Sequence, residues 1–161
     1  MVKQKKAKKW FPVVAPDYLG GKLVGSVLAS EPSDLIGRTI SVLLSELTDD
    51  PSHTTVKIKF KITGVKGETA FTELWGYELD RDFVRSLLRK GSSRVDIVFN
   101  AASKDGYQMR VSAIAVTRYR ASQSQKKKMR RAMMNIVLGK CSKLNYSQLV
   151  QELVFGKVES D

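Results

Sequence analysis

Residues 55–63 read TVKIKFKIT, and this stretch is the clearest half-buried strand in the sequence. Four apolar side chains alternate along it with three lysines: Val56, Ile58, Phe60 and Ile62 with Lys57, Lys59 and Lys61. Successive side chains of a β-strand point to opposite faces, so this two-residue period predicts a strand with one buried face and one wet face. The lysines form a flat basic strip, which we interpret as the wet side of a sheet in preference to a binding face.

Four further stretches favour β-structure. They are residues 38–46 (RTISVLLSE), 69–77 (TAFTELWGY), 94–101 and 107–118. A turn signal, TDDP at residues 48–51, follows the first of them, and Asp105-Gly106 between the last two is typical of a hairpin turn, in a loop that can exceed two residues. Five or six strands with hairpin-like connections predict an antiparallel β-barrel or a strongly curled sheet.

Three helices are predicted outside these strands. They cover residues 80–90, residues 122–138 and a segment from about 145 to 156, with stops at Gly91, Gly139 and Gly156. Asp80 is the predicted N-cap of the first helix, and Ser122 and Gln125 have the spacing of a capping box at the start of the second.

The predicted fold class is therefore α+β. We expect an antiparallel β-barrel or strongly curled sheet as the core, about three peripheral helices and a basic N-terminal arm. Residues 1–9 (MVKQKKAKK) are too charged to pack and are predicted to be a flexible arm. Residues 10–161 are predicted to be a single domain, with a basic helical part at about 119–156. Trp10 is expected to anchor the chain on the barrel rather than stack on a base.

The positive charge of the chain is localised. The formal net charge is +12, and residues 106–151 contain ten basic residues and no acidic one, while residues 1–9 add five lysines. A localised charge of this size favours a dense polyanion as the partner, because binding releases the condensed counterions of the polyanion. Nucleic acid is the predicted class of partner.

Three groups of residues are candidates for RNA contact. The arm supplies Lys3, Lys5, Lys6, Lys8 and Lys9. The helix at 80–90 supplies a row of arginines one helical turn apart, Arg81, Arg85 and Arg89, with Arg94 just beyond it. The stretch at 118–131 (RYRASQSQKKKMRR), which we call the basic block, supplies Arg118, Tyr119, Arg120, Lys126, Lys127, Lys128, Arg130 and Arg131. Arginine binds phosphate through two hydrogen bonds, and a tyrosine ring can stack on a base.

Each group also has a structural explanation. Lysine tails can simply solubilise a protein, Arg85 can pair with Asp82 on a solvated helix face, and the basic block can be a localisation-like run. We prefer RNA contact for the basic block because it is long and free of acids, and because phosphates would offset the repulsion between its charges. Its methionine at 129, with Met133 and Met134, is interpreted as core packing.

Composition argues against several other classes of protein. Cys141 and His53 are the only cysteine and the only histidine, which excludes an intrachain disulfide and a Cys/His metal site and fits an intracellular location. No apolar run is long enough to span a bilayer, and no apolar segment follows the basic N-terminus as in a secretory signal. We expect no enzyme and no cofactor; a Mg²⁺-dependent nuclease using Asp49 and Asp50 is the remaining catalytic alternative.

A set of short stretches along nearly the whole chain is informative through its order. The stretches are Lys8-Lys9-Trp10, Ala15-Pro16, Ile36-Gly37-Arg38, Leu47-Thr48-Asp49-Asp50, residues 57–62 (KIKFKI), residues 81–87 (RDFVRSL), Asp105-Gly106-Tyr107, Arg110-Val111, residues 120–123 (RASQ) and residues 152–157 (ELVFGK). Taken in order, they resemble the archaeal and eukaryotic small-subunit ribosomal protein family called S-three-A, or S-three-Ae in archaea. The short length resembles the archaeal branch.

This resemblance implies a β-barrel core with helices, in a structural protein of the small ribosomal subunit in the cytoplasm. It implies a place on the platform near the mRNA exit, contacts with small-subunit rRNA near its 3′ end and with neighbouring ribosomal proteins, and mRNA nearby. No membrane contact and no homo-oligomer are expected. Family members usually continue beyond Gly156-Lys157 with a further basic segment, whereas this sequence stops at Asp161, so any contact made by that segment is either absent or lies outside these residues.

A free RNA-binding or RNA-chaperone factor is the alternative function. OB-like folds that act in this way present exposed aromatic side chains on their strands. Here Phe60, Phe71 and Phe99 are expected to point inward, which counts against this alternative.

Overall fold

The computed structural model describes the backbone of residues 7–154, and contacts divide the chain into two compact units, Met1–Arg81 and Asp82–Asp161. Each unit is described on its own below. The division into an arm of residues 1–9 and a single domain of residues 10–161 stays a prediction.

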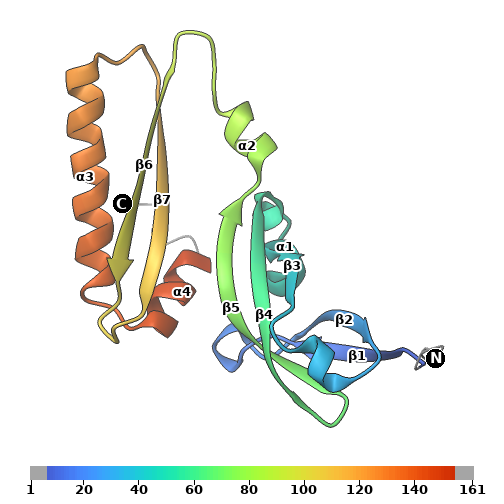
Figure 1. Cartoon of the computed structure of the whole chain (residues 1–161). Helices are drawn as coiled ribbons and strands as arrows, with labels where there is room; N and C mark the ends of the chain where they lie inside the picture. Colours follow the sequence, from blue (N-terminus) through green and yellow to red (C-terminus); the bar gives the residue numbers. More distant parts are fainter. Residues whose placement is uncertain (1–6, 155–161) are drawn as a thin grey trace, which may run out of the picture. The chain divides into compact units, whose positions relative to one another are not determined.

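The first unit is built on a five-stranded sheet with the strand order β2-β1-β5-β4-β3 (Figure 1). The strands are β1 (Lys9–Val14), β2 (Leu23–Ala29), β3 (Thr39–Leu43), β4 (Val56–Lys66) and β5 (Thr69–Leu79). Neighbouring strands are antiparallel, apart from β1 and β5, which pair in parallel at Val13 with Ala70 and at Val14 with Phe71.

Strand β4 contains the stretch TVKIKFKIT and confirms its two-residue period. Its four apolar side chains are buried, and the lysines between them are exposed or half-buried. Strand β4 pairs with both β3 and β5 and so lies inside the sheet. In the antiparallel part of such a sheet, one face of each inner strand packs on the core and is therefore apolar. Its ladder with β5 changes register after Lys59 and after Ile62, and such bulges bend a strand pair.

The sheet is not closed into a barrel, so the predicted barrel is not confirmed. Strands β2 and β3 are its two edges and do not pair with each other. The predicted strands at 94–101 and 107–118 form a separate two-stranded sheet, β6 (Ser93–Ala102) and β7 (Gln108–Thr117), and so they do not close the first one. The mixed α+β class itself is confirmed.

Several elements of the first unit are absent from the predictions, among them strands β1 and β2 and one short α-helix. Helix α1 (Leu44–Thr48) replaces the end of the predicted strand at 38–46, because Leu44 and Leu47 are three residues apart and one helical turn buries both. The helix ends at Asp49, whose φ of 57° is the left-handed conformation of a C-cap. Strand β2 is also unpredicted, and it forms one edge of the sheet.

One hydrophobic cluster holds the first unit together. Its buried members are Phe11, Val13, Ala29, Leu35, Ile62 and Ala70, with Val27, Ile40 and Val65 packed against them. Phe11 therefore anchors β1, whereas Trp10 is 66% exposed, so the expected anchoring role of Trp10 is wrong. Strand alternation explains why Phe11 is the anchor in place of Trp10, since neighbouring residues of a strand face opposite sides.

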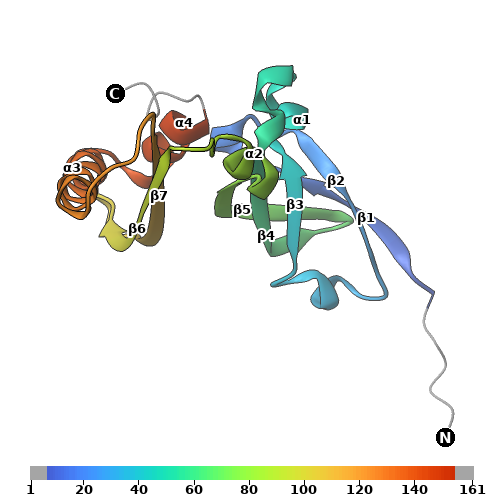
Figure 2. The same cartoon turned by 90° about the horizontal axis from the view of Figure 1, so that it is seen from above.

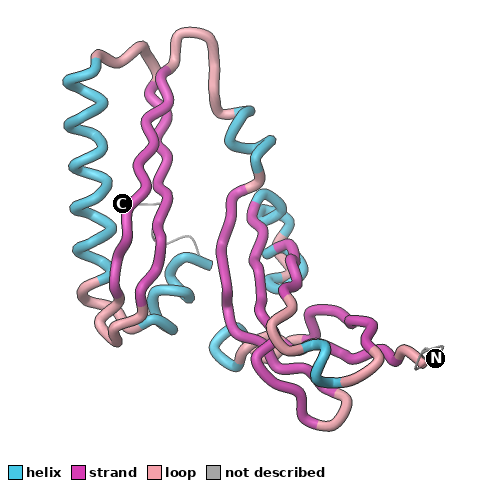
Figure 3. The backbone as a smooth tube through the Cα atoms, in the orientation of Figure 1, coloured by secondary structure: helices cyan, strands magenta, loops and turns pink. Residues whose placement is uncertain are grey.

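The second unit contains most of helix α2 (Arg81–Ser86), a β-hairpin and two further helices (Figures 2 and 3). Strands β6 and β7 pair from Ser93 with Thr117 to Ala102 with Gln108, so the predicted turn at Asp105-Gly106 is confirmed as part of a longer loop. Helix α3 (Gln123–Cys141) runs along the β6 side of the hairpin, and α4 (Tyr146–Val154) lies at the end of the hairpin that carries the turn (Figure 1).

The helix boundaries differ from the predicted ones. Helix α2 (Arg81–Ser86) is shorter than residues 80–90, and the chain continues as a loop to Gly91. Helix α3 passes through Gly139 and ends at Cys141, because Cys141 and Val137 pack into the core of the second unit. The predicted end of α4 at Gly156 lies outside the described residues.

The tip of the hairpin holds the start of α4. The backbone N–H of Tyr146 donates to Oδ2 of Asp105 at 3.0 Å, and the rings of Tyr107 and Tyr146 stack with their centroids 4.9 Å apart. Behind this contact lies the second core, formed by Ala101, Cys141 and Leu149, with Phe99, Met109, Val111, Val137 and Leu144 against them.

Candidate nucleic-acid interface

Little of the arm is described by the structure. Lys3, Lys5 and Lys6 lie outside the described residues, while Lys8 and Lys9 are exposed and Lys9 begins β1. The RNA contact proposed for this group therefore stays a prediction.

The arginine row is not assembled as predicted. Arg81 and Arg85 lie on α2, but the helix ends at Ser86, so Arg89 is not on the same helical face. Arg85 Nη1 lies 3.3 Å from Oδ1 of Asp82, which is the structural alternative foreseen for this residue. Arg94 lies on β6, opposite Val116 of β7, and is exposed. Arg89 and Arg94 thus lie outside α2, and the predicted row on one helical face is not formed.

A capping box fixes the start of α3 and with it the basic block. Oγ of Ser122 accepts from the backbone N–H of Gln125, and Oε1 of Gln125 accepts from the backbone N–H of Ser122 at 2.9 Å. These bonds satisfy two of the donors that every helix leaves unpaired at its N-terminus. The predicted capping box is confirmed, and it places the lysines on the first turns of the helix.

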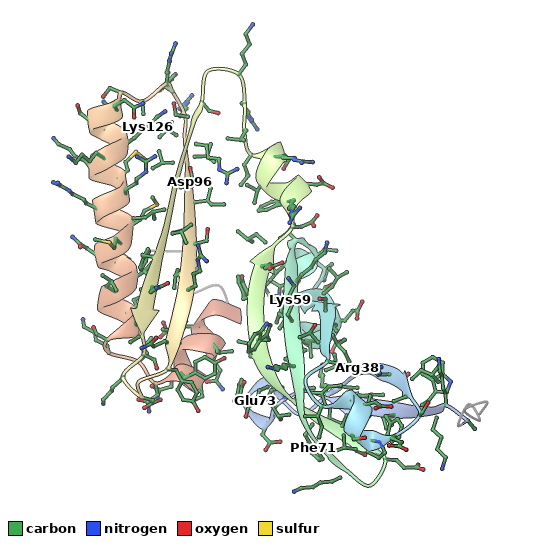
Figure 4. All side chains as sticks on the ribbon, viewed as in Figure 1. Arg38, Lys59, Phe71, Glu73, Asp96 and Lys126 are labelled. Carbon is green, nitrogen blue, oxygen red and sulfur yellow. The ribbon has the colours of Figure 1, made fainter. Side chains whose placement is uncertain are left out.

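The basic side chains of α3 divide between two faces. Lys126, Met129, Arg130 and Met133 are half-buried, at the spacing of the face that turns to the hairpin. Lys127, Lys128 and Arg131 are exposed. The helix therefore presents an exposed cationic face beside a half-buried face that mixes two methionines with two cations (Figure 4 labels Lys126 near the first turn).

Arg130 has a structural partner. Its Nε donates to the backbone carbonyl of Asp96 on β6 at 3.0 Å (Figure 4 labels Asp96). This bond satisfies a carbonyl at the strand edge and ties the helix to the hairpin. Of the five basic residues of α3 that were predicted to bind RNA, Arg130 is thus the one with a side-chain hydrogen bond to another element within residues 7–154.

The basic block has no acidic partner among the described residues. The ion pairs of residues 7–154 join Lys22 with Asp49, Lys57 with Asp80, Lys59 with Glu78 and Arg85 with Asp82. None of them includes a residue of the block at 118–131, so its charges are not neutralised within the described chain. Uncompensated cations on one surface are what a polyanion binds.

The lysine strip of β4 behaves differently from the block. Lys57 Nζ lies 2.7 Å from Oδ1 of Asp80, and Lys59 Nζ lies 2.7 Å from Oε1 of Glu78. The hydrogen bond from Lys57 lowers the pKa of Asp80 below its ordinary value, with a smaller opposing effect of desolvation. Paired lysines on a sheet face agree with its interpretation as the wet side of the sheet.

The loop between β7 and α3 borders a hollow of about 460 Å³. Its lining residues are Thr117, Arg118, Tyr119, Arg120, Ala121, Gln125, Lys128 and Met129. Tyr119 is 73% exposed, and Cζ of Arg118 lies 5.5 Å from the centre of its ring, a cation–π distance. The structure therefore brings Tyr119, three cations of the basic block and an apolar wall to one place.

The sequence reasoning missed two exposed aromatic side chains on β5. Phe71, expected inside, is 42% exposed, and Trp75 is 63% exposed. Each lies next to a lysine of β4: Nζ of Lys61 is 4.2 Å from the Trp75 ring centre, and Nζ of Lys66 is 5.6 Å from that of Phe71. Alternation within TAFTELWGY was the available signal, since it sets Phe71, Glu73 and Trp75 apart from Ala70 and Thr72 (Figure 4 labels Phe71 and Glu73).

The described residues offer no group of three or more His, Cys, Asp or Glu side chains that could hold a metal ion. Asp49, the first aspartate of the nuclease alternative, serves as the C-cap of α1 and pairs with Lys22. Among residues 7–154 no helix is long and apolar enough to cross a membrane.

Comparison with known proteins gives a consistent result. The model of the Ribosomal S3Ae family matches residues 1–161. The small ribosomal subunit protein eS1 of Desulfurococcus amylolyticus is 43% identical over 162 residues, covering 100% of this chain and 76% of the relative. The protein of the same name from Pyrobaculum islandicum is 42% identical over 96% of this chain and 69% of the relative, and that from Archaeoglobus fulgidus is 39% identical over 96% and 74%.

The family is one of ribosomal structural proteins and not of enzymes, and archaeal members match along the whole chain. The resemblance carried by the ordered short stretches is therefore confirmed by overall similarity. A localised cationic surface without acidic partners is also what a protein of a ribonucleoprotein particle requires. From its sequence match over residues 1–161, this chain belongs to the Ribosomal S3Ae family.

Proposed function

We propose that this protein is a structural constituent of the small ribosomal subunit in the cytoplasm and that it binds small-subunit rRNA mainly through the exposed cations of the basic block. The observation that carries the proposal is that Lys127, Lys128 and Arg131 are exposed on one helix and have no ion pair among the described residues. Family membership supports the ribosomal setting.

The distribution of charge between the two units supports this assignment. Residues 82–161 contain 16 basic and six acidic residues, whereas residues 1–81 contain 12 and ten, and five of those 12 are the lysines of residues 1–9. The binding charge therefore lies in the second unit and at the N-terminus. Contacts to phosphates position a protein on RNA without reading its sequence, so we expect shape and backbone contacts to dominate.

The location within the particle is the finer part of the proposal. We place the protein on the platform near the mRNA exit, against rRNA close to its 3′ end, with neighbouring ribosomal proteins and with mRNA nearby. The support is the order of family-like stretches along the chain, and the arm and Arg81, Arg85, Arg89 and Arg94 are proposed as additional contacts. Directed hydroxyl-radical probing from single cysteines placed on α3 would map the rRNA segments nearby, and cleavage away from the 3′ region would contradict this placement.

The rRNA contact can be tested by the salt dependence of binding. Replacing Lys127, Lys128 and Arg131 by Gln should lower the slope of log K against log salt by about 0.7 to 0.9 for each lost phosphate contact. The matched control replaces Lys22, Lys57 and Lys59 by Gln, which changes net charge equally but removes cations that have acidic partners and lie outside the proposed contacts. Equal slopes for the two triple variants would contradict the role of the basic block.

A free RNA-binding or RNA-chaperone factor is the second candidate function, and one observation favours it. Trp75 and Phe71 are exposed on a strand and each lies beside a lysine, as in sheets that bind single strands. Sucrose-gradient fractionation of native lysate at low and high salt separates the two functions. A chain that stays with the small subunit after the high-salt wash supports the ribosomal role, and one that remains at the top of the gradient supports the free factor.

A further inference from the structure

We propose that the hollow between β7 and α3 binds one unstacked nucleotide of RNA, with its base against the ring of Tyr119 and its phosphate against Arg120 and Lys128. This proposal rests on the proposed function, because it assumes that the basic block meets RNA. It adds the class of RNA that this place recognises: an unpaired or bulged nucleotide, as opposed to the backbone of a regular duplex.

The loop that carries Tyr119 is held in place from both ends. Oγ1 of Thr117 donates to the carbonyl of Tyr119 at 2.7 Å and accepts from the backbone N–H of Ser93 at 3.0 Å. The backbone N–H of Ala121 donates to Oγ of Ser93 at 3.1 Å. Ser93 is itself buried at the start of β6. A fixed loop loses little conformational entropy on binding, which is how a preformed site gains affinity.

The lining of the hollow has the chemistry that a nucleotide needs. Tyr119, Ala121 and Met129 supply apolar surface for a base, and the cations of Arg118, Arg120 and Lys128 lie around it. The hollow is wide open to solvent, so its size of about 460 Å³ describes a surface depression against which a base can lie and not an enclosed pocket. Base recognition by proteins commonly combines an aromatic or arginine plane with cations that hold the phosphate.

One further donor is available at this place. Oε1 of Gln125 is used by the capping box, and among the described residues Nε2 of Gln125 has no hydrogen-bond partner. An amide nitrogen donates two hydrogen bonds, so it can meet an acceptor on the edge of a base. Cζ of Arg118 lies 5.5 Å from the centre of the Tyr119 ring, and Tyr119 is 73% exposed, so the ring is accessible to a base.

A regular duplex does not explain this arrangement. In duplex RNA the bases are stacked on each other, and the phosphates need cations but no aromatic ring. An exposed ring beside a hollow gains stacking only from a base that has left its own stack. Removing such a stacking partner weakens binding by roughly 5- to 150-fold in single-strand complexes.

The test uses the full-length chain and three short RNA hairpins. One contains a single unpaired 2-aminopurine, one has an abasic site at that position, and one is fully paired. We expect tighter binding of the first hairpin and quenching of its fluorescence, because a 2-aminopurine base stacked on an aromatic ring is quenched. Tyr119→Leu should reduce affinity for this hairpin about tenfold and leave the other two within twofold, whereas Tyr119→Phe should keep the preference.

The phosphate contact is tested by two adjacent lysines. Lys128 lines the hollow and Lys127 does not, although both are exposed on α3. Lys128→Gln should reduce the preference for the bulged hairpin over the paired one, and Lys127→Gln should weaken both equally. Circular dichroism of each variant checks that the fold is retained, and Tyr119→Phe provides a variant that keeps the ring.

The outcomes separate this proposal from the proposed function. Equal binding of all three hairpins with a normal salt dependence overturns the nucleotide site and leaves rRNA binding intact. Equal loss on the abasic and 2-aminopurine hairpins in Tyr119→Leu also overturns it, since no base contact would then have been removed. Absence of salt-dependent binding to any of the hairpins contradicts the proposed function as well.

Discussion

Neutralising two neighbouring cations of α3 should change the free energy of unfolding in opposite directions. Arg130→Gln removes the bond from Nε to the carbonyl of Asp96 at 3.0 Å, on a half-buried side chain. Lys127→Gln removes an exposed charge that lies one turn from Arg131. Glutamine and the two basic residues have similar helix propensities, so propensity contributes little to either change.

The magnitudes follow from the two environments. A hydrogen bond from a charged donor is worth roughly 1.5 to 3 kcal/mol when buried, and we take about 1 to 1.5 for this half-exposed one. Each like-charge pair a turn apart on a helix costs about 0.2 to 0.5 kcal/mol. Arg130→Gln should therefore lose about 0.5 to 1 kcal/mol after the relief of repulsion from Lys126, and Lys127→Gln should gain a few tenths.

Urea unfolding followed by ellipticity at 222 nm measures both effects, since α3 is the longest helix of the described chain. Repeating it in about 0.5 M salt, where charges are strongly screened, should abolish the gain of Lys127→Gln and enlarge the loss of Arg130→Gln. Two variants that shift stability in the same direction at low salt, or an Arg130→Gln variant as stable as the parent, would refute the division of α3 into two faces.

Three further predictions follow from burial and from perturbed pKa values. Phe60→Ala should lose about 3 to 5 kcal/mol of unfolding free energy, because the side chain is 0% exposed, whereas Phe71→Ala should lose far less; chemical denaturation compares them. The bond with Lys57 lowers the pKa of Asp80 below its ordinary 3.8, so the ionised carboxylate stabilises the folded state at any pH above 3.8, and this stabilisation is lost as the pH falls through the lowered pKa. Asp80→Asn should therefore lose less stability than the parent on acidification, measured by thermal unfolding at a series of pH values. Burial raises the pKa of the Cys141 thiol above its ordinary 9.0, so this thiol should react slowly with a disulfide reagent near neutral pH until urea unfolds the second unit. Rapid labelling of the native chain would contradict the place of Cys141 in the core.

Local patterns predict much of this chain because their causes lie within a few residues. The alternation at residues 55–63 fixes the buried face of β4, and the spacing of Ser122 and Gln125 fixes the start of α3. Both signals act through neighbouring side chains and backbone donors, so no distant residue can easily override them.

The remaining features depend on partners far away in the sequence. The parallel pairing of β1 with β5 at Val13 and Ala70 leaves no mark on either strand, and no local pattern shows in advance that the edge strands β2 and β3 do not pair with each other. Helix α1 is not predicted from the sequence because its leucines are also typical of a β-strand. The early end of α2 at Ser86 removes Arg89 from a row that its spacing alone predicts.

The candidate site shows the same limit. The acid-free composition of the basic block is visible in the sequence, but the bond that commits Arg130 to β6 and the hollow beside Tyr119 require the hairpin to be in place. The number of charges can be counted in the sequence, but whether a charged side chain is free to bind RNA depends on how it packs in the folded chain.

The contact between the hairpin tip and α4 sets an order of events during synthesis. Asp105 and Tyr107 emerge from the translating ribosome well before Tyr146, whose N–H and ring they bind. The hairpin of β6 and β7 can therefore form by local pairing before α4 has been synthesised. The first backbone N–H of α4 can bind Asp105 only when the chain has grown past residue 146. A substitution in the hairpin turn would thus act late, as delayed docking of the last helix, although the altered residue itself is made early.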